Sequence, residues 1–227
     1  MRPHAVHAVI AVKSLDQAKS RLADRLRPEH RARLVLAMLA DTLTATAAVP
    51  EIASVVVVTP DPVVADLARS MDAAVHPEPR SAGLDGLNNA LADAAAGLRH
   101  RHGPVDLLAL QADLPALRAE ELADVLTLAP RGLRSIVVDH AGTGTAALLV
   151  RDPVADLEPR FGPGSAGKHI AAGAVDLTGD WPGLRLDVDT AEDLDLAIEL
   201  GAGCATRVAL HDIGWPDRVH QPVRRVC

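Results

Sequence analysis

The sequence predicts an α/β protein with a doubly wound, mainly parallel sheet. Short runs of Val, Leu, Ile and Ala, typical of strands buried on both faces, alternate with longer segments of helical periodicity. A chain of 227 residues can bury one substantial core. Phe161, Trp181 and Trp215 are its only Phe, Tyr or Trp residues. Ala, Val and Leu must therefore fill the core, as they do where Ala-rich helices cover parallel strands.

Composition and charge narrow the function classes. The formal net charge is −7 and the isoelectric point is about 5.8, whereas proteins that bind nucleic acids or anionic membranes favour basic surfaces. No apolar run is long enough to span a membrane, and no signal-peptide pattern opens the sequence. Cys204 and Cys227 are too few for a disulfide framework. We therefore expect a cytoplasmic protein without nucleic-acid or membrane partners.

Strands and helices alternate in the first half of the chain. Pro28 is a favourable first residue of a helix, because its missing N–H falls where a helix has no internal acceptor. The Thr-Pro-Asp-Pro sequence at 59–62 ends the run of valines before it. We expect a buried strand over 7–12, a helix over 28–48, a strand over 54–58, a helix over 64–71, a short strand over 74–76 and a helix over 87–98.

The second half continues the alternation and adds a hairpin. The apolar runs 135–139 and 146–150 bracket a Gly-Thr-Gly-Thr turn, a pattern typical of two antiparallel strands. No strong periodicity persists beyond Gly203, so we expect one domain over 1–203 and a loosely attached tail over 204–227. The other expected elements are a strand over 105–110, a helix over 120–128, a loop over 158–167, a late strand over 184–188 and a helix over 191–200 that Gly201 ends.

Carboxylates follow two of the expected strands. Asp113 comes after the first, and Asp187 and Asp189 alternate with Val188, which places both carboxylates on one face of an extended segment. An aspartate after a strand can simply cap a turn, and Asp189 or Thr190 could cap the next helix. We expect Thr190 to cap that helix and the three aspartates to hold a divalent metal. Such a set suits Mg²⁺, which completes its octahedron with phosphate oxygens and water.

A basic segment follows the first strand. Lys13, Lys19 and Arg21 lie between that strand and the helix that Pro28 begins. Fixed cations there can neutralise a triphosphate and stabilise charge on a transferring phosphorus; the alternative is a solvated basic patch. The segment lacks the GxxxxGK(S/T) loop of P-loop NTPases. Because ligands of parallel α/β sheets bind at the carboxyl ends of the strands, we expect these cations to face the aspartates.

The segment before the helix over 87–98 is a candidate base-recognition loop. Gly83 lets the backbone approach a flat ring, and the amides of Asn88 and Asn89 can hydrogen-bond a base or a ribose. The alternative is an ordinary helix N-terminus, which Asp85 alone would explain.

Two glycine-rich turns are candidate anion sites. The segments 142–145, Gly-Thr-Gly-Thr, and 161–165, Phe-Gly-Pro-Gly-Ser, offer backbone N–H groups and hydroxyls with little steric bulk. Turns of this composition often do no more than reverse the chain. Lys168 and His169 follow the second turn and are the basic pair that we expect to face a second substrate, whereas the histidines as a group show no metal-ligand spacing.

Five segments, taken in order, resemble one family: the guanylyltransferases of deazaflavin coenzyme (factor 420) biosynthesis, which act on 2-phospholactate or phosphoenolpyruvate. The resemblance runs from about His7 to Gly203 and leaves the tail outside the pattern. The segments are Ala11-Val12-Lys13 with Ala18-Lys19-Ser20-Arg21-Leu22, Gln111-Ala112-Asp113-Leu114-Pro115, Gly142-Thr143-Gly144-Thr145, Arg160-Phe161-Gly162-Pro163 and Asp187-Val188-Asp189-Thr190.

The resemblance implies a GT-A-like nucleotidyltransferase fold, with GTP as donor, Mg²⁺ as cofactor and pyrophosphate as product. The acceptor is then a phosphorylated three-carbon acid. Phosphoenolpyruvate is favoured, because the resemblance is to actinobacterial forms; 2-phospholactate and 3-phosphoglycerate stay open. The implied metal ligands are Asp113, Asp187 and Asp189. The implied contacts of the acceptor carboxylate are Thr145, Gly162 and Ser165.

Other classes of protein share parts of this pattern. Nucleotidyltransferases for molybdopterin or sugar phosphates usually open with a Gly-rich nucleotide loop, where this chain has Val-Lys-Ser-Leu at 12–15. Glycosyltransferases with a DxD motif carry it after a middle strand, whereas Asp187 and Asp189 come late. A nucleotide-binding regulatory module without catalysis would not need all three aspartates.

Overall fold

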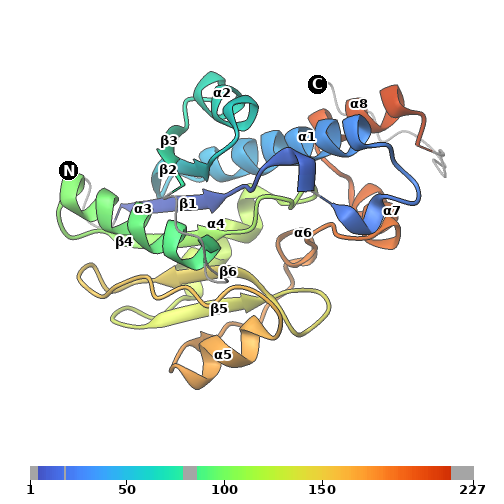
Figure 1. Cartoon of the computed structure of the whole chain (residues 1–227). Helices are drawn as coiled ribbons and strands as arrows, with labels where there is room; N and C mark the ends of the chain where they lie inside the picture. The colour runs from blue at the N-terminus through green and yellow to red at the C-terminus, as the bar shows by residue number, and fades with distance from the viewer. Residues whose placement is uncertain (1–4, 18, 79–85, 216–227) are drawn as a thin grey trace.

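The computed structural model describes residues 5–17, 19–78 and 86–215, and it confirms an α/β fold with a mainly parallel sheet (Figure 1). The sheet has the strand order β3-β2-β1-β4-β6-β5-β7. β6 is antiparallel to both of its neighbours, β4 and β5, and the other adjacent pairs are parallel. The strands are β1 (Val6–Ala11), β2 (Ile52–Thr59), β3 (Ala74–Pro77), β4 (Asp106–Leu110), β5 (Arg134–Val138), β6 (Thr145–Val150) and β7 (Val175–Asp176).

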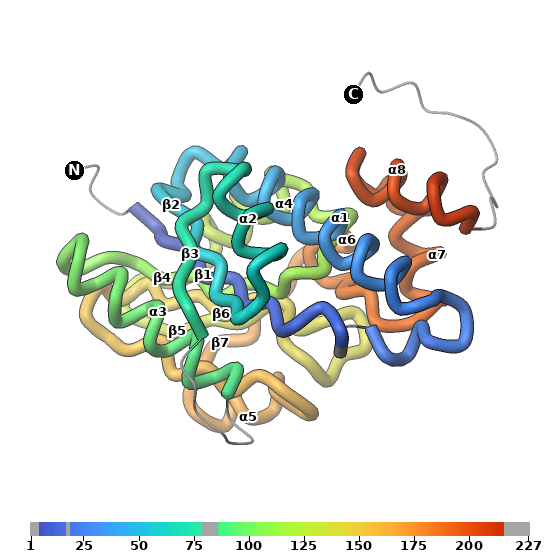
Figure 2. The backbone as a smooth tube through the Cα atoms, turned by 45° about the horizontal axis from the view of Figure 1, so that its top comes forward, coloured from blue at the N-terminus to red at the C-terminus, as the bar shows by residue number. Residues whose placement is uncertain are grey.

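Helices cover both faces of this sheet. α1, α2 and α4 lie on one face, and α3 and α5 lie on the other (Figure 2). Side chains of each set join the buried cluster on their own face. The helices are α1 (Pro28–Ala47), α2 (Pro62–Ser70), α3 (Gly86–His102), α4 (Ala119–Leu128), α5 (Ser165–Ala171), α6 (Pro182–Arg185), α7 (Ala191–Leu200) and α8 (Cys204–Ile213), with the 3-10 helices η1 (Leu15–Gln17) and η2 (Ser20–Leu22) between β1 and α1. None of the helices in the described part of the chain has the length and apolar character that crossing a bilayer requires.

The central strands send alternate side chains into the two clusters. In β1, Ala8 and Ile10 face the α1 side, and Val9 faces the α3 side. Val57 and Val58 divide in the same way in β2. Burying such an aliphatic side chain contributes about 1.5 to 3 kcal/mol, and a slip by one residue would exchange the two faces. The register of the parallel strands, and with it the position of their carboxyl ends, is therefore strongly specified.

Most of the expected elements are confirmed. α1 begins at Pro28, and the runs around the Gly-Thr-Gly-Thr turn form the antiparallel pair β5 and β6. Thr190 caps α7 as predicted: its hydroxyl accepts the N–H of Asp193 at 3.2 Å, while the Asp193 carboxylate accepts the N–H of Thr190 at 2.7 Å. This reciprocal pair satisfies backbone donors that the helix leaves unpaired.

Two expectations in the second half are wrong. The segment 184–188 is no strand: α6 occupies its first residues, because Pro182 starts a short helix whose Gly183 N–H is accepted by the carboxylate of Glu121 at 3.0 Å. The segment 158–167 is not loop throughout, since Ser165 begins α5. Neither short helix carries enough periodicity to stand out in the sequence.

Residues 204–215 are not loosely attached, contrary to the expectation for the tail over 204–227; the rest of that tail lies outside the described residues. Residues 204–213 form α8, which lies alongside α1 (Figures 1 and 2). The carboxylate of Asp41 in α1 accepts the N–H groups of Ala205 and Thr206 at 3.0 and 2.8 Å and so caps α8 from another helix. Leu210 enters the core on the α1 side. The cap was not visible in the sequence because donor and acceptor lie far apart along the chain.

We predict that the Asp41 cap stabilises the folded protein. Asp41→Ala leaves two N–H groups at the start of α8 without their acceptor, so we expect a loss of about 1 to 2 kcal/mol in the free energy of unfolding. Chemical denaturation measures it, with Asp24→Ala, which removes an exposed carboxylate before α1, as the matched control. Equal stability of the two variants would mean that α8 contributes no cooperative stability.

Candidate active site

An aspartate cluster lies at the carboxyl edge of the parallel strands. Asp113 follows β4, and the backbone N–H of Val188 donates to the carbonyl oxygen of Asp113 at 3.1 Å. This bond holds the extended segment after α6 beside the end of β4, although that segment is no strand of the sheet. Asp187 and Asp189 therefore lie close to Asp113, as the sequence predicts.

Lys19 joins two of these carboxylates. Its ammonium donates to Asp113 and, at 2.9 Å, to Asp189. The Lys19 side chain is only 9% exposed. Burial opposes its charge, but the negative charges of Asp113 and Asp189 prevail and raise the pKa of Lys19 above its usual range. The lysine is thus a permanent cation between two carboxylates.

The backbone around Lys19 is arranged to hold this position. Lys19 has a φ of 51°, in the left-handed region that few non-glycine residues adopt. The fully buried side chain of Leu22 anchors the segment on one side. On the other, the N–H of Leu15 donates to the Asp61 carboxylate at 3.0 Å, which ties the segment to the end of β2. Backbone strain that the surrounding structure maintains is common at functional sites.

Asp187 is the least satisfied carboxylate of the cluster. Its Oδ1 is buried and has no hydrogen-bond partner, and the nearest imidazole nitrogen, Nδ1 of His140, is 3.7 Å away. Burial first, and the negative charge of Asp113 second, raise the pKa of Asp187 from 3.8 to about 6. A buried carboxylate oxygen without a donor is a place where a cation would be stabilised.

The oxygen ligands of the cluster suit Mg²⁺, but their present arrangement is set by the Lys19 ammonium. Within the described residues, no three His, Cys, Asp or Glu side chains already stand in metal-binding geometry. The ammonium of Lys19 instead lies against Asp113 and Asp189. The oxygen donors, their concentrated negative charge and the unpaired Oδ1 of Asp187 nevertheless fit a hard divalent cation, which would take over the charge balance that Lys19 now provides.

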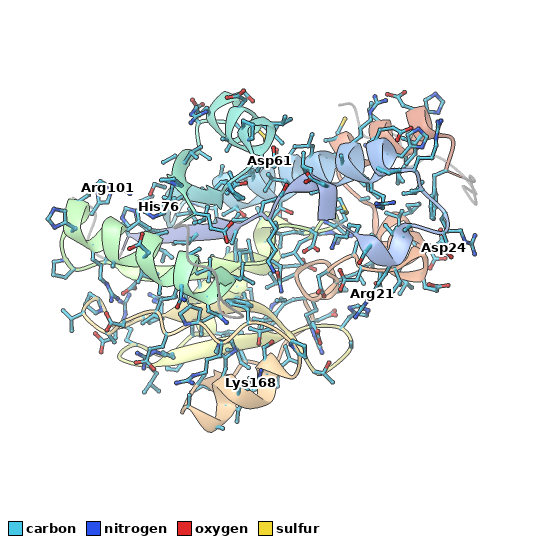
Figure 3. All side chains as sticks on the ribbon, viewed as in Figure 1. Arg21, Asp24, Asp61, His76, Arg101 and Lys168 are labelled. Carbon is cyan, nitrogen blue, oxygen red and sulfur yellow. The ribbon has the colours of Figure 1, made fainter. Side chains whose placement is uncertain are left out.

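The other predicted cations are more exposed. The Arg21 guanidinium lies 3.5 Å from Asp189 and is 71% exposed, so this ion pair contributes little stability. Figure 3 shows Arg21 at the end of the molecule opposite Arg101. Lys13 is exposed and follows β1 by two residues. Both side chains remain accessible to an anion at the same edge as the aspartates.

Two hydroxyls and an imidazole form a second cluster. Thr145 begins β6, and Ser165 begins α5. Their hydroxyl oxygens are 3.1 Å apart, and Nδ1 of His169 lies 3.0 Å from that of Thr145. All three residues are buried. His169 was expected to face a second substrate as a basic group. It instead packs against Thr145 in the interior, and burial lowers the pKa of its imidazole to about 4.

The turn before Thr145 is built on Asp139, which the sequence reasoning missed. Its carboxylate oxygens accept the N–H groups of Thr143 and Gly144 at 3.0 and 2.9 Å. A Cβ on Gly144 would collide with the Asp139 carboxylate and displace the group that holds the turn, so glycine suits this position. An aspartate shortly before a Gly-Thr-Gly-Thr turn was the available signal.

Asn88 holds the loop that carries Gly162. Its Oδ1 accepts the N–H of Phe161 at 2.8 Å, and its Nδ2 donates to the carbonyl of the same residue at 3.1 Å. Gly162 follows with a φ of 121°, a conformation open mainly to glycine. The amide of Asn88 is thus engaged with backbone, while Asn89 is exposed. Gly83 lies outside the described residues, so base recognition by this segment stays a prediction.

The two clusters are neighbours in the fold. The N–H of Gln111 donates to the carbonyl of Ala146 at 3.0 Å, and its side-chain amide donates to the carbonyl of Thr145 at 3.3 Å. Gln111 precedes Asp113 by two residues. Asp113 therefore follows β4, and the neighbouring strand β6 begins with Thr145. The two clusters therefore lie at the same edge of the sheet.

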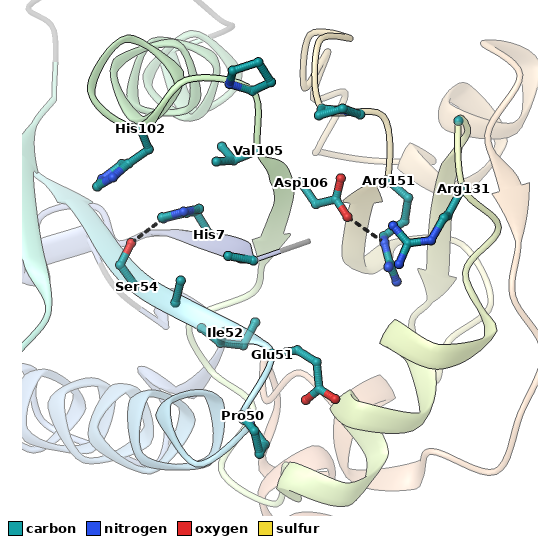
Figure 4. A pocket seen from close by; sticks show the side chains of 15 residues that line it. His7, Pro50, Glu51, Ile52, Ser54, His102, Val105, Asp106, Arg131 and Arg151 are labelled. Carbon is teal, nitrogen blue, oxygen red and sulfur yellow. Dashed lines mark hydrogen bonds and ion pairs between the residues drawn. The ribbon is translucent and has the colours of Figure 1, made fainter. Parts of the chain in front are cut away.

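A cavity of about 1280 Å³ lies at the opposite edge of the sheet, where the parallel strands begin (Figure 4). His7, at the start of β1, stacks on His102 with ring centroids 4.6 Å apart and is 2.7 Å from the Ser54 hydroxyl. Arg151 and Asp106 form a buried ion pair at 2.9 Å. The described residues that line this cavity include none of the predicted site residues, so this cavity and the aspartate cluster are separate features.

Solved structures of other proteins share the fold of this chain. A nucleotidyl transferase from Methanothermobacter superposes with a TM-score of 0.59 at 18% identity, covering 86% of this chain and 97% of that one. A cytidylyltransferase from Leptospira borgpetersenii superposes with a TM-score of 0.55 at 14% identity, covering 96% and 100%. At these identities the likeness shows the fold alone. The fold is that of the nucleotidyltransferases, and the aspartates at the strand ends suit that chemistry.

Sequence comparison then defines the family. A phosphoenolpyruvate guanylyltransferase from Nocardia farcinica is 75% identical over 227 residues, which is the full length of both chains. One from Rhodococcus opacus is 53% identical over 214 residues, covering 90% of this chain and 89% of that one. The family model for CofC-like guanylyl transferases matches residues 6–224. The chain belongs to this family of nucleotidyltransferases, and the match extends into the segment that the sequence analysis left outside the pattern.

From the raised pKa of Asp187 we predict how the stability of the fold changes with pH. The folded protein holds this proton more tightly than the unfolded chain, so stability falls as pH rises from about 3.8 to about 6, and the buried carboxylate is destabilising above that range. Without divalent metal, Asp187→Asn should therefore unfold at higher temperature than wild type at pH 7.5. We expect a gain on the order of 1 to 3 kcal/mol.

The gain should vanish near pH 3.5, where both folded and unfolded carboxyls are protonated. Thermal melts at the two pH values measure it, and Asp180→Asn, an exposed neighbour, is the control. An Asp187→Asn protein less stable than wild type at pH 7.5 would contradict the assignment of an unpaired buried charge.

Proposed function

We propose that this protein transfers the guanylyl group of GTP to the phosphate of phosphoenolpyruvate and releases pyrophosphate, with Mg²⁺ as cofactor, in deazaflavin coenzyme biosynthesis. The observation that carries the proposal is the aspartate cluster around the unpaired Oδ1 of Asp187, beside a hydroxyl-lined cluster. Family membership supports guanylyl transfer, and the names of the Nocardia and Rhodococcus relatives support the acceptor.

The donor half of the proposed site would bind the triphosphate of GTP. Lys19, Arg21 and Lys13 lie at the edge that carries the aspartates and can offset the phosphate charge. Asp113, Asp187 and Asp189 would hold Mg²⁺, which when bound supplies charge neutralisation and orientation at the α-phosphate. Lys19 must exchange its carboxylate partners for phosphate oxygens as the nucleotide binds, and its fixed backbone keeps the ammonium within the site.

The acceptor half binds a small anionic acid. Thr145, Ser165 and the backbone around Gly162 offer donors suited to a carboxylate. The acceptor phosphate oxygen then attacks the α-phosphorus in line, the bond from the α-phosphorus to the bridging oxygen breaks, and pyrophosphate leaves. A phosphate monoester is already anionic at neutral pH, so the chain needs no strong general base. Its contribution is to hold two anions in reacting geometry.

Activity depends on the aspartate cluster. With GTP, Mg²⁺ and phosphoenolpyruvate, wild type should release pyrophosphate and form a product with the mass of the guanylyl adduct. Asp113→Asn should lower turnover on the order of 10²-fold or more, because a lost metal ligand removes several kcal/mol of transition-state stabilisation. Asp66→Asn, an exposed carboxylate of α2, is the control. Wild-type rates for Asp113→Asn would reject the metal assignment, and rapid product formation with 2-phospholactate or 3-phosphoglycerate alone would change the acceptor.

Base choice tests the nucleotide half. A pocket that hydrogen-bonds the O6, N1 and N2 groups of guanine has polar groups of its own that adenine would leave unpaired. GTP should therefore be preferred strongly over ATP and CTP. Asn89→Ala should lower that preference. Asn88→Ala should instead raise the KM for the acceptor, because it releases the Phe161 backbone. Steady-state rates with each nucleotide decide the point, and equal use of ATP and GTP by wild type would reject a guanine-reading pocket.

A further inference from the structure

His169 is buried in α5 with both ring nitrogens engaged. Nε2 lies 2.9 Å from the backbone nitrogen of Arg160, and Nδ1 lies 3.0 Å from the Thr145 hydroxyl. The ring also meets Phe161 edge to face at a centroid distance of 5.5 Å. His169 is only 2% exposed, and Thr145 and Ser165 are buried with it at 1% and 2%.

The Arg160 contact fixes the tautomer of this ring. A backbone N–H can only donate, so Nε2 must offer its lone pair, and the hydrogen of a neutral imidazole must be on Nδ1. Protonation would place a second donor against the Arg160 N–H. Burial, together with the positive charges of Arg160 and Lys168, lowers the pKa of His169 to about 4, so the ring is neutral at physiological pH. A hydrogen bond to the Ser165 backbone opposes this shift without outweighing it. Nδ1–H therefore faces the Thr145 hydroxyl and the Ser165 backbone as a donor, so Thr145 cannot donate to the ring.

The tautomer decides how many hydroxyl hydrogens remain. Thr145 and Ser165 have one hydrogen each and share one hydrogen bond at 3.1 Å. Because Thr145 accepts from His169, that shared bond uses one hydrogen and leaves the other for a ligand. With the hydrogen on Nε2, Thr145 would have to donate to Nδ1 and Ser165 to Thr145, so both hydrogens would be used. The pair would then present lone pairs, which repel an anion.

We propose that His169 is a positioning residue that keeps the Thr145–Ser165 pair in the donor state required to bind the acceptor carboxylate. The inference rests on the proposed function for the identity of that anion. The same ring holds the Arg160 backbone, next to the Phe161 backbone that Asn88 holds from α3. His169 thereby couples the loop that carries Gly162 to the hydroxyl pair, without touching the substrate itself.

Two variants separate the functions of the two nitrogens. Asn places an amide N–H where Nδ1–H stands, and Gln places a carbonyl oxygen where Nε2 accepts. His169→Gln should keep the Arg160 contact but lose the donor to Thr145, and we expect the KM for phosphoenolpyruvate to rise tenfold or more, with the KM for GTP changed less than twofold. His169→Asn keeps the donor and gives up only the Arg160 contact, while Asn88 still holds the Phe161 backbone, so both KM values should stay within about threefold of wild type. His211→Gln, in the exposed face of α8, is the control.

An NMR measurement of the ring tests the tautomer without any substrate. In wild type at pH 7.5, the two-bond proton–nitrogen correlations of His169 should show hydrogen on Nδ1, with no titration above about pH 5. Hydrogen on Nε2 overturns the inference, as does an equal rise of the phosphoenolpyruvate KM in both variants. If His169→Gln does not fold, the wild-type tautomer alone decides. A wild type that uses no phosphorylated three-carbon acid rejects the proposed function instead, and leaves the tautomer result to stand separately.

Discussion

Three carboxylates lie together at one edge of the sheet and repel one another. The arrangement of the candidate site depends on how this repulsion is offset. Asp113, Asp187 and Asp189 come together because the end of β4 and the segment after α6 are joined through backbone. Lys19 offsets two of these charges, and a left-handed backbone conformation holds it there. Asp187 stays unpaired. The fold accepts this local cost because its register is fixed by aliphatic burial elsewhere, and the remaining negative charge is what attracts a cation.

The second half of the site is held by a different device. Its loops lack strand partners, so side chains take up their backbone N–H groups: Asp139 for the Gly-Thr-Gly-Thr turn, Asn88 for Phe161 and His169 for Arg160. Buried side chains that bind backbone fix a loop more narrowly than solvent does. The hydroxyls of Thr145 and Ser165 are thereby placed without help from a ligand. Donors held this narrowly suit the small acid that we propose as acceptor, which has few atoms to contribute to affinity.

Prediction from sequence succeeded where the signal was local. The start of α1 at Pro28, the β5–β6 hairpin and the Thr190 cap follow from residue types at fixed offsets. It failed for 184–188, because an alternating Asp-Val-Asp motif suits an extended segment outside a sheet as well as a strand. It failed again for α8, whose cap comes from Asp41 in a distant helix. His169 looked like a surface base, since nothing near it in sequence announces the Arg160 and Thr145 contacts.

The sequence by itself determined the fold class and the edge of the sheet that carries the site, because hydrophobic periodicity and strand-end residues are properties of short segments. It also singled out the three aspartates, although Asp187 and Asp189 lie in an extended segment and do not follow a strand. Tertiary structure alone decided that Lys19 balances two of them, that Oδ1 of Asp187 is left without a hydrogen bond and that the His169 ring lies against Thr145. These are contacts between residues far apart in the chain. Charge balance and hydrogen-bond direction depend on distance in space, which one-dimensional spacing does not contain.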